Sequence, residues 1–421
     1  MTPSTNSENL SEFDRARRFA PEFQLALACT HWPLRSQHRA EICRLVSEPV
    51  NWKWFKEIID RNQILPLAYH NLQDTLPGAH HSEIVRALRD AVIGLTGQSM
   101  SQAAELVRIT ESVRSAGFEI AALKGVSLSV LAYGNLAMRS PGDIDVLVSG
   151  AHVFDVERVL KGLGYNRADP RAELTPRRLN HYLRYYKHFT YFCEEKAAPL
   201  ELHWRLFHNI PLLKEADAKF PPTMPVEVGS NIVYTLSRNE LFLYLCVHGS
   251  VHGWPILKWL ADIGALLSLM TTADIADVAE LATRRGLLAE VRAALSLVDL
   301  FLTVEGPTFE LPGEAQPVAE RIVEMAQRLL TAQDYCLEVQ RLPRLAMFLY
   351  DLRLRSSWRY RSEDIRRALV HPPDWDRLNL PDALFPLYAA VRPVSWLLRH
   401  LPRLSRRHTA VDNSSRPFSS S

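Results

Sequence analysis

Two aspartates, Asp143 and Asp145, stand on alternate residues of the apolar run 142–148. Alternate residues of a β-strand point to the same face, so both carboxylates would share one face while Ile144 and Val146 point into a core. Like charges this close repel each other, and the arrangement is costly unless a cation lies between them. Carboxylates suit Mg²⁺, which is commonly held by one or two of them together with substrate phosphates. The run therefore predicts a metal site for phosphate chemistry.

The composition limits the classes to which this chain can belong. Its 421 residues are enough for two or three domains, and a formal net charge of +2 demands neither nucleic acid nor an anionic membrane as a partner. The five cysteines form no C-x-x-C pair, which argues against a zinc cluster or a disulfide framework. The first 12 residues are polar, and no apolar run reaches membrane-spanning length. We therefore expect a soluble, cytoplasmic protein.

The pattern of apolar residues divides the chain into helical and mixed parts. Apolar residues at helical spacing dominate both ends, and short apolar runs typical of strands cluster between them. The expected fold class is α+β, a small mixed sheet flanked by N- and C-terminal helical domains. The expected divisions are a flexible N-terminus at 1–20, a helical region at 21–117, an α/β core at 118–210, a proline-bearing linker at 211–235, a helical domain at 236–408 and a disordered serine-rich tail at 409–421.

A candidate phosphate-binding turn precedes the aspartates. The short apolar strand at 119–123 is followed by Lys124 and Gly125, and then by a helix-like segment that contains Ser127. Glycine at this place lets a phosphate approach the backbone, and a helix N-terminus offers unpaired N–H groups and the positive end of its dipole. Lys124 is either a phosphate contact or a surface cation. Ser127 fits a phosphate ligand and a plain helix start equally well.

A third acidic residue follows on another alternating strand. In the segment 200–204, Glu201 and His203 would share one strand face, with Leu200 and Leu202 on the other. If this strand lies beside the aspartate strand, Glu201 completes a cluster of three carboxylates. His203 would then lie either behind the metal ligands or in the core.

Such a cluster suits nucleotidyl transfer. Attack of a hydroxyl on the α-phosphate of a nucleoside triphosphate develops charge on the entering and leaving oxygens, and two cations bridged by carboxylates stabilise both. In this hypothesis Asp143 and Asp145 bridge the metals, while Glu201 holds the catalytic metal and takes the proton. Arg139, just before the pair, is a candidate contact for triphosphate oxygens.

These motifs resemble those of a known family. The quoted patterns are A-L-K-G-V-S at 122–127, R-S-P-G-D-I-D-V-L-V at 139–148 and L-E-L-H-W at 200–204. Together they resemble the DNA polymerase β-like nucleotidyltransferase superfamily, and more narrowly a bacterial group known as uncharacterised nucleotidyltransferases. The resemblance covers roughly residues 40–270. It implies metal roles for Asp143, Asp145 and Glu201, a phosphate role for the Gly125 turn, Mg²⁺ or Mn²⁺ as the metal, and a nucleoside triphosphate as substrate.

The resemblance implies transfer of a nucleoside monophosphate to an unidentified hydroxyl or phosphate acceptor, which could be a small molecule, a tRNA or a protein. The main alternative is a non-catalytic nucleotide-binding or regulatory module of the same fold. Val126 between Gly125 and Ser127, and Glu201 where the group often has aspartate, favour that alternative. Two further alternatives are a mainly helical interaction protein and a metal-dependent hydrolase that uses His248 and His252.

The segment 386–408 alternates apolar residues with arginines. It fits an ordinary terminal helix with a solvated basic face, and also a weak contact with an anionic membrane or RNA.

Overall fold

A single mixed sheet of seven strands forms the centre of the protein. A computed structural model describes residues 19–76, 82–196, 198–209, 220–302, 315–331, 344–355 and 357–393. The strand order is β3-β4-β5-β2-β1-β7-β6. The strands are β1 (Ile120–Ala122), β2 (Ile144–Val148), β3 (Asn166–Asp169), β4 (His188–Phe192), β5 (Leu200–His203), β6 (Thr223–Val228) and β7 (Asn231–Leu236). β2 lies between antiparallel β1 and parallel β5, so the aspartate strand is central.

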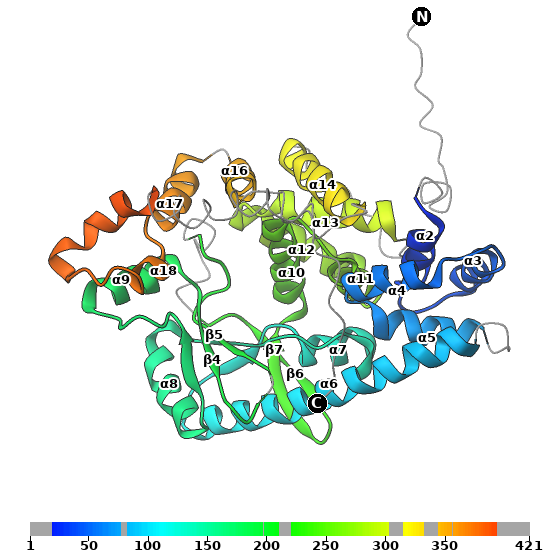
Figure 1. Cartoon of the computed structure of the whole chain (residues 1–421), viewed down its shortest axis with the longest axis horizontal. Helices are drawn as coiled ribbons and strands as arrows, with labels where there is room; N and C mark the ends of the chain where they lie inside the picture. The colour runs from blue at the N-terminus through cyan, green and yellow to red at the C-terminus, as the bar shows by residue number, and fades with distance from the viewer. Residues whose placement is uncertain are drawn as a thin grey trace, which may run out of the picture.

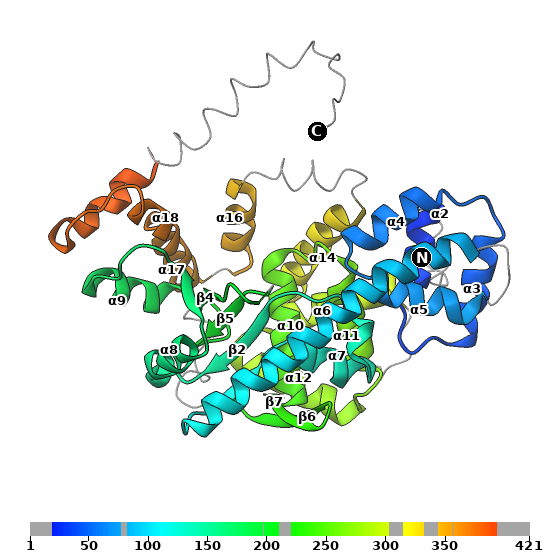
Figure 2. The same cartoon turned by 60° about the horizontal axis from the view of Figure 1, so that its bottom comes forward.

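Helices cover the sheet and extend well beyond it (Figures 1 and 2). The N-terminal helices are α2 (Pro21–Ala28), α3 (Ser36–Val46), α4 (Trp52–Arg61), α5 (Leu65–Thr75) and α6 (Ser82–Ser115). Helices α7 (Val126–Tyr133), α8 (Val153–Gly162) and α9 (Pro176–Tyr185) alternate with the strands. The C-terminal helices are α10 (Arg238–His252), α11 (Leu257–Leu267), α12 (Thr272–Arg285), α13 (Leu288–Phe301), α14 (Gln316–Thr331), α16 (Arg344–Arg353), α17 (Trp358–Leu369) and α18 (Pro372–Trp375). The expected α+β class is confirmed.

The N- and C-terminal helices share one hydrophobic core rather than forming two separate ones. Leu25 of α2, Ile59 of α4 and Phe301 of α13 belong to the same buried cluster. The backbone N–H of Leu257 donates to Asn62 Oδ1 at 3.1 Å, which ties the start of α11 to the end of α4. A second cluster lies under the sheet, where α6 packs its apolar stripe against β1 and β7.

The expectation of a linker at 211–235 is wrong for residues 223–235. Residues 223–236 form the hairpin β6–β7, and β7 joins the sheet beside β1, with Ala122 opposite Thr235. Pro225 lies in β6, at the edge of the sheet, where a missing N–H donor costs no internal hydrogen bond. The prolines were therefore a misleading signal. The polar edge strand β3 and the helix α9 were also missed.

Several expectations fall outside the described residues. They concern the flexible N-terminus, of which residues 1–18 are not described, the disordered tail at 409–421, and residues 394–408 of the basic stretch. Within the stretch, Arg392 is described, and its side chain donates to the carbonyl of Ala368 and to Asp374. Among the described residues, no helix combines the length and the apolar character needed to cross a membrane.

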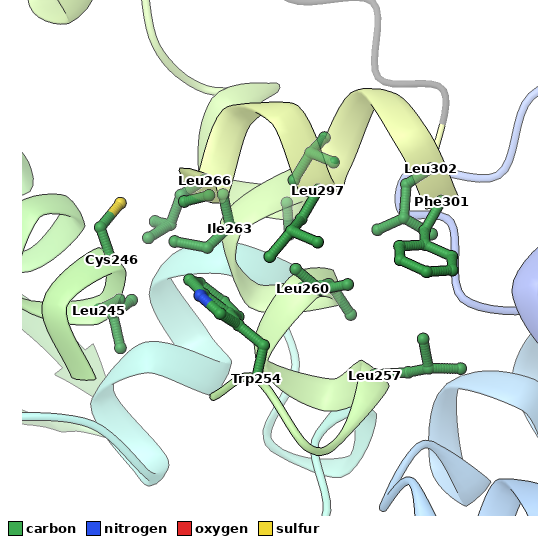
Figure 3. Close-up of a cluster of buried hydrophobic side chains, with 14 of the residues drawn as sticks. Leu245, Cys246, Trp254, Leu257, Leu260, Ile263, Leu266, Leu297, Phe301 and Leu302 are labelled. Atoms are coloured by element: carbon green, nitrogen blue, oxygen red, sulfur yellow. The ribbon is translucent and has the colours of Figure 1, made fainter. Parts of the chain in front are cut away.

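Trp254 anchors the junction between α10 and α11. Its ring is fully buried among apolar side chains from α10, α11 and α13 (Figure 3). The ring lies flat against Gly249, where an added Cβ would come within 2.5 Å of ring atoms. No side chain larger than hydrogen fits there.

We predict that Gly249→Ala lowers the free energy of unfolding by about 1–3 kcal/mol, because the new methyl group overpacks the Trp254 ring. Urea unfolding of the full chain measures the change. Gly97→Ala on α6 is the matched control, since an added Cβ there meets nothing within 4 Å. The control variant should be as stable as the parent or more stable by up to about 1 kcal/mol. Equal stability of Gly249→Ala and the parent would contradict the packing described here.

Candidate active site

The sheet brings Asp145 and Glu201 side by side. In the parallel pairing of β2 with β5, Asp145 lies directly opposite Glu201. Partners in a parallel ladder point to the same face, so the two carboxylates converge. Asp145 is only 2% exposed, whereas the Glu201 side chain is partly open to solvent. The convergence expected from the two alternating strands is therefore present.

Two basic groups hold Asp145 in its buried position. The Lys124 ammonium lies 3.2 Å from Asp145 Oδ2, and His203 Nε2 lies 3.3 Å from Asp145 Oδ1. His203 Nε2 is also 3.1 Å from Glu201 Oε2, so this fully buried ring joins the two carboxylates. Burial raises the pKa of Asp145, but the charge of Lys124 and the hydrogen bond from His203 outweigh it and hold that pKa well below its usual range.

Asp143 lies in the turn before β2, closer to solvent. Partial burial raises its pKa, and the negative charges of Asp145 and Glu201 raise it further. The three carboxylates are thus close enough to repel one another. A divalent cation bound there would remove this repulsion.

Gly125 makes the turn between β1 and α7. Its φ of +71° and ψ of −123° lie in a region that side-chain-bearing residues rarely adopt. It caps α7, and its α-carbon faces the carbonyl of Asp143, which an added Cβ would meet at 3.6 Å. The unpaired N–H groups at the start of α7 therefore open beside the aspartates, as expected from the sequence.

Ser127 is not placed to contact a ligand. It is fully buried, and its hydroxyl donates to the carbonyl of Lys124 at 3.3 Å. Ser127 therefore has the role of a residue at the start of a helix, which was one of its two expected roles. It does not line the cavity described below.

Arg139 is fixed from a distant part of the chain. Its Nε donates to both carboxylate oxygens of Asp262 at 3.1 Å, and the Tyr133 hydroxyl donates to Asp262 Oδ1 at 3.0 Å. This buried group ties the loop before β2 to α11. Within the described residues, the Nη atoms of Arg139 make no hydrogen bond, and Arg139 lines the adjacent cavity. A phosphate contact for Arg139 stays a prediction.

A cavity of about 510 Å³ opens beside these groups and is called here the first cavity. The N-terminal helices, the sheet and the C-terminal helices all contribute to it. Its lining includes Asp60, Gln63, Leu65, Lys124, Gly125, Arg139, Ser140, Pro141, Gly142, Asp143, Asp145, Ile256, Lys258 and Trp259. Lys258 was not found by sequence analysis. Its ammonium donates to Gln63 Oε1, and burial, aided by the charge of Arg139, lowers its pKa to about 7.

The residues present fit a divalent cation. Asp145 Oδ2 is buried and accepts no hydrogen bond, although the Lys124 ammonium is near. Asp143 and Glu201 carry further carboxylate oxygens that could act as ligands. A second donor set lies next to it: one ligand atom each from His188, Glu201 and His203 come within 4.8 Å of one another. In the described part of the chain, this is the group found with metal-ligand spacing. It contains Glu201 but neither Asp143 nor Asp145, and neither His248 nor His252.

His248 and His252 pack against an aromatic ring instead. Their ring centres lie 4.8 and 5.6 Å from that of Trp259. Burial lowers the pKa of His252 to about 4 and that of His248 well below its usual range, so both rings are neutral. The hydrolase alternative, which needed them as a metal pair, has no support from this arrangement.

Comparison with known proteins agrees with the geometry. Residues 48–303 match the family described as uncharacterised nucleotidyltransferase. The chain belongs to this family. The match spans α4 to α13, including the whole sheet, and contains every residue that lines the first cavity. Membership of this family supports nucleotidyl transfer as the general activity of the protein. None of the curated proteins matches the chain significantly.

Lys258 makes a pH-dependent contribution to stability that can be measured. Its folded pKa of about 7 lies below that of an unfolded lysine. Above pH 7 the unfolded chain therefore binds a proton that the folded chain does not, and the stability contribution rises with pH. From pH 6 to pH 9, we expect the free energy of unfolding of the parent to rise by roughly 2 kcal/mol relative to that of Lys258→Met. Urea unfolding at both pH values tests this, and a stability difference that does not change with pH would contradict it.

Proposed function

We propose that the protein transfers a nucleoside monophosphate from a nucleoside triphosphate to an acceptor and releases pyrophosphate, in a metal-dependent reaction. One observation carries the proposal: Asp145 and Glu201 are direct partners in the sheet, with Asp143 two residues before Asp145 and the Lys124–Gly125 turn beside it. Family membership gives the general reaction, and the arrangement of these residues supports the finer assignment.

The triphosphate would bind in the first cavity. Lys124, Lys258 and Arg139 supply positive charge along its lining, and the start of α7 supplies backbone N–H groups at Gly125. Trp259 and Leu65 add apolar surface, which suits a base or sugar. A volume of about 510 Å³ lies within the range of ligand pockets.

Asp143, Asp145 and Glu201 would hold Mg²⁺ or Mn²⁺. When bound, the metal supplies charge stabilisation at the entering and leaving oxygens. The protein residues position the carboxylates. Lys124 and His203 fix the Asp145 carboxylate, and the β2–β5 pairing sets its distance from Glu201.

In the reaction, a hydroxyl oxygen of the acceptor forms a bond to the α-phosphorus. The bond from the α-phosphorus to the bridging oxygen breaks, and pyrophosphate leaves with the electron pair. The hydroxyl proton passes to the Glu201 carboxylate, whose Oε2 lies 3.1 Å from His203 Nε2.

A non-catalytic nucleotide-binding module stays a second candidate. It is favoured by the way in which Lys124 and His203 already balance the charge of buried Asp145. Such a protein would bind the nucleotide in the first cavity without turnover.

We predict that purified full-length protein with Mg²⁺ or Mn²⁺ transfers label from an α-labelled nucleoside triphosphate to an acceptor. Asp145→Asn and Glu201→Gln should each lower the rate by about 100-fold or more, because each removes a charge that acts on the reacting groups. Thermal unfolding confirms that the variants are folded.

Asp155→Asn is the matched control, because Asp155 is an acidic residue of α8 that pairs with Arg158 away from the cavity. It should keep the parental rate. Equal labelling by the parent and by Asp145→Asn would contradict the assignment. Nucleotide binding without labelling of any acceptor would favour the non-catalytic module.

A further inference from the structure

A second cavity, of about 330 Å³, is lined by residues of α10, α16 and α17 and by residues next to β4 and β5. Figure 1 shows these elements. The residues of this second cavity used below are Lys187, His208, Asn209, Tyr244, Asp351 and Arg367. It shares no lining residue with the first cavity. His248 lines the second cavity and packs its ring on Trp259, which lines the first, so these two rings separate the cavities at that point.

The second cavity reaches close to the carboxylates on the Glu201 side. His188 Nδ1 lies 3.6 Å from Glu201 Oε2, and the centres of the His188 and His208 rings are 6.4 Å apart. Asp145 and Glu201 both act electrostatically on Tyr244 and on Lys187. Lys124 and Gly125 line the first cavity, on the other side of Asp145. Asp143 and Asp145 thus line the first cavity, and Glu201 lies on the side of the second cavity, next to His188.

Polar atoms around the second cavity have no protein partner. The Tyr244 hydroxyl makes no hydrogen bond although the residue is only 1% exposed. His208 Nδ1 and Asn209 Oδ1 are also buried without a hydrogen bond, and Asn209 is 5% exposed. Buried polar atoms in folded proteins nearly always have partners, so a group of such atoms around one cavity indicates that a ligand supplies them.

Positive charge in the second cavity is only partly balanced. The Lys187 ammonium makes no hydrogen bond or ion pair with the described residues. Arg367 Nη2 lies 3.5 Å from Asp364 and 3.9 Å from Asp351, which are loose contacts. Burial raises the pKa of Asp351 to about 7, so this carboxyl is partly neutral near pH 7. Burial also lowers the pKa of His208, so this ring is neutral. Asp351 and Asp364 line the same cavity and each has a buried oxygen without a hydrogen bond, but both lie near Arg367, so Lys187 is the cation that is left for an anion.

We propose that the second cavity binds the acceptor, and that the acceptor is a small molecule carrying an anionic group, such as a phosphate, at Lys187 and Arg367 and a hydroxyl directed toward Glu201. The acceptor role rests on the proposed nucleotidyl transfer. The anion site itself rests on the cavity, its unpartnered polar atoms and its cations. The volume fits a small metabolite and excludes the body of a tRNA or a folded protein.

The test is calorimetric titration of inorganic phosphate into the full-length protein and its variants. Lys187→Gln and Tyr244→Phe should each weaken phosphate binding, Lys187→Gln by about tenfold or more, the factor expected for a lost charged hydrogen bond. Lys161→Gln is the matched control, because Lys161 lies on α8, pairs with Glu157 and lines neither cavity, and it should leave this binding in place. Phosphate binding that is unchanged in Lys187→Gln would overturn the proposal, and so would absence of binding at millimolar phosphate.

Thermal unfolding provides a second readout that does not depend on a ligand. Tyr244→Phe removes a hydroxyl without a partner, so the melting temperature should stay the same or rise. Tyr350→Phe is the matched control, because the Tyr350 hydroxyl donates to the carbonyl of Ser250 at 2.6 Å. The control variant should melt lower than the parent but bind phosphate normally. A melting temperature lowered as much by Tyr244→Phe as by Tyr350→Phe would show that the Tyr244 hydroxyl has a protein partner and would contradict the proposal.

Failure of nucleotidyl transfer is distinguishable from failure of the anion site. Phosphate binding that depends on Lys187 without any transfer activity would overturn the acceptor role and keep the site. Transfer activity that is insensitive to Lys187→Gln and Tyr244→Phe would keep the proposed function and overturn the acceptor site. Glycerol 3-phosphate against glycerol is the probe for that comparison, and the phosphate-bearing compound should be the better acceptor.

Discussion

The buried carboxylate of Asp145 sets the position of everything else in the site. An isolated buried charge would be too costly, and Asp145 is ionised because Lys124 lies 3.2 Å from one oxygen and His203 lies 3.3 Å from the other. Lys124 comes from the turn after β1 and His203 from the end of β5. Three neighbouring strands are therefore linked through one side chain, and this linkage aligns Glu201 with Asp145.

A second buried ion pair places the helices around that centre. Arg139 and Asp262 are 123 residues apart in the chain, and their contact holds the loop before β2 against α11. Removing one partner of such a pair leaves an uncompensated buried charge, at a cost of about 3–5 kcal/mol. The first cavity has walls from the N-terminal helices, the sheet and α11, so it depends on the shared helical core as much as on the sheet.

The sequence allowed the sheet-borne part of the site to be predicted, because alternation along a strand determines which side chains share a face. Asp145 and Glu201 meet for that reason, and Gly125 has the positive φ expected of a turn glycine. Lys258 and Asp262 could not be predicted as site residues, since their contacts depend on how a distant helix docks. The same holds for the second cavity, which needs α10, α16 and α17 to meet. The prolines at the sheet edge indicated a linker where the chain forms β6 and β7.

The most direct test is a crystal structure of the protein with Mn²⁺ and a non-hydrolysable nucleoside triphosphate, with Mn²⁺ located by its anomalous scattering. The account predicts Mn²⁺ coordinated by Asp143 and Asp145, with the phosphates in the first cavity against the Gly125 turn. Mn²⁺ bound only by His188, Glu201 and His203, with no ion at the aspartates, would contradict it. So would a triphosphate bound away from the first cavity.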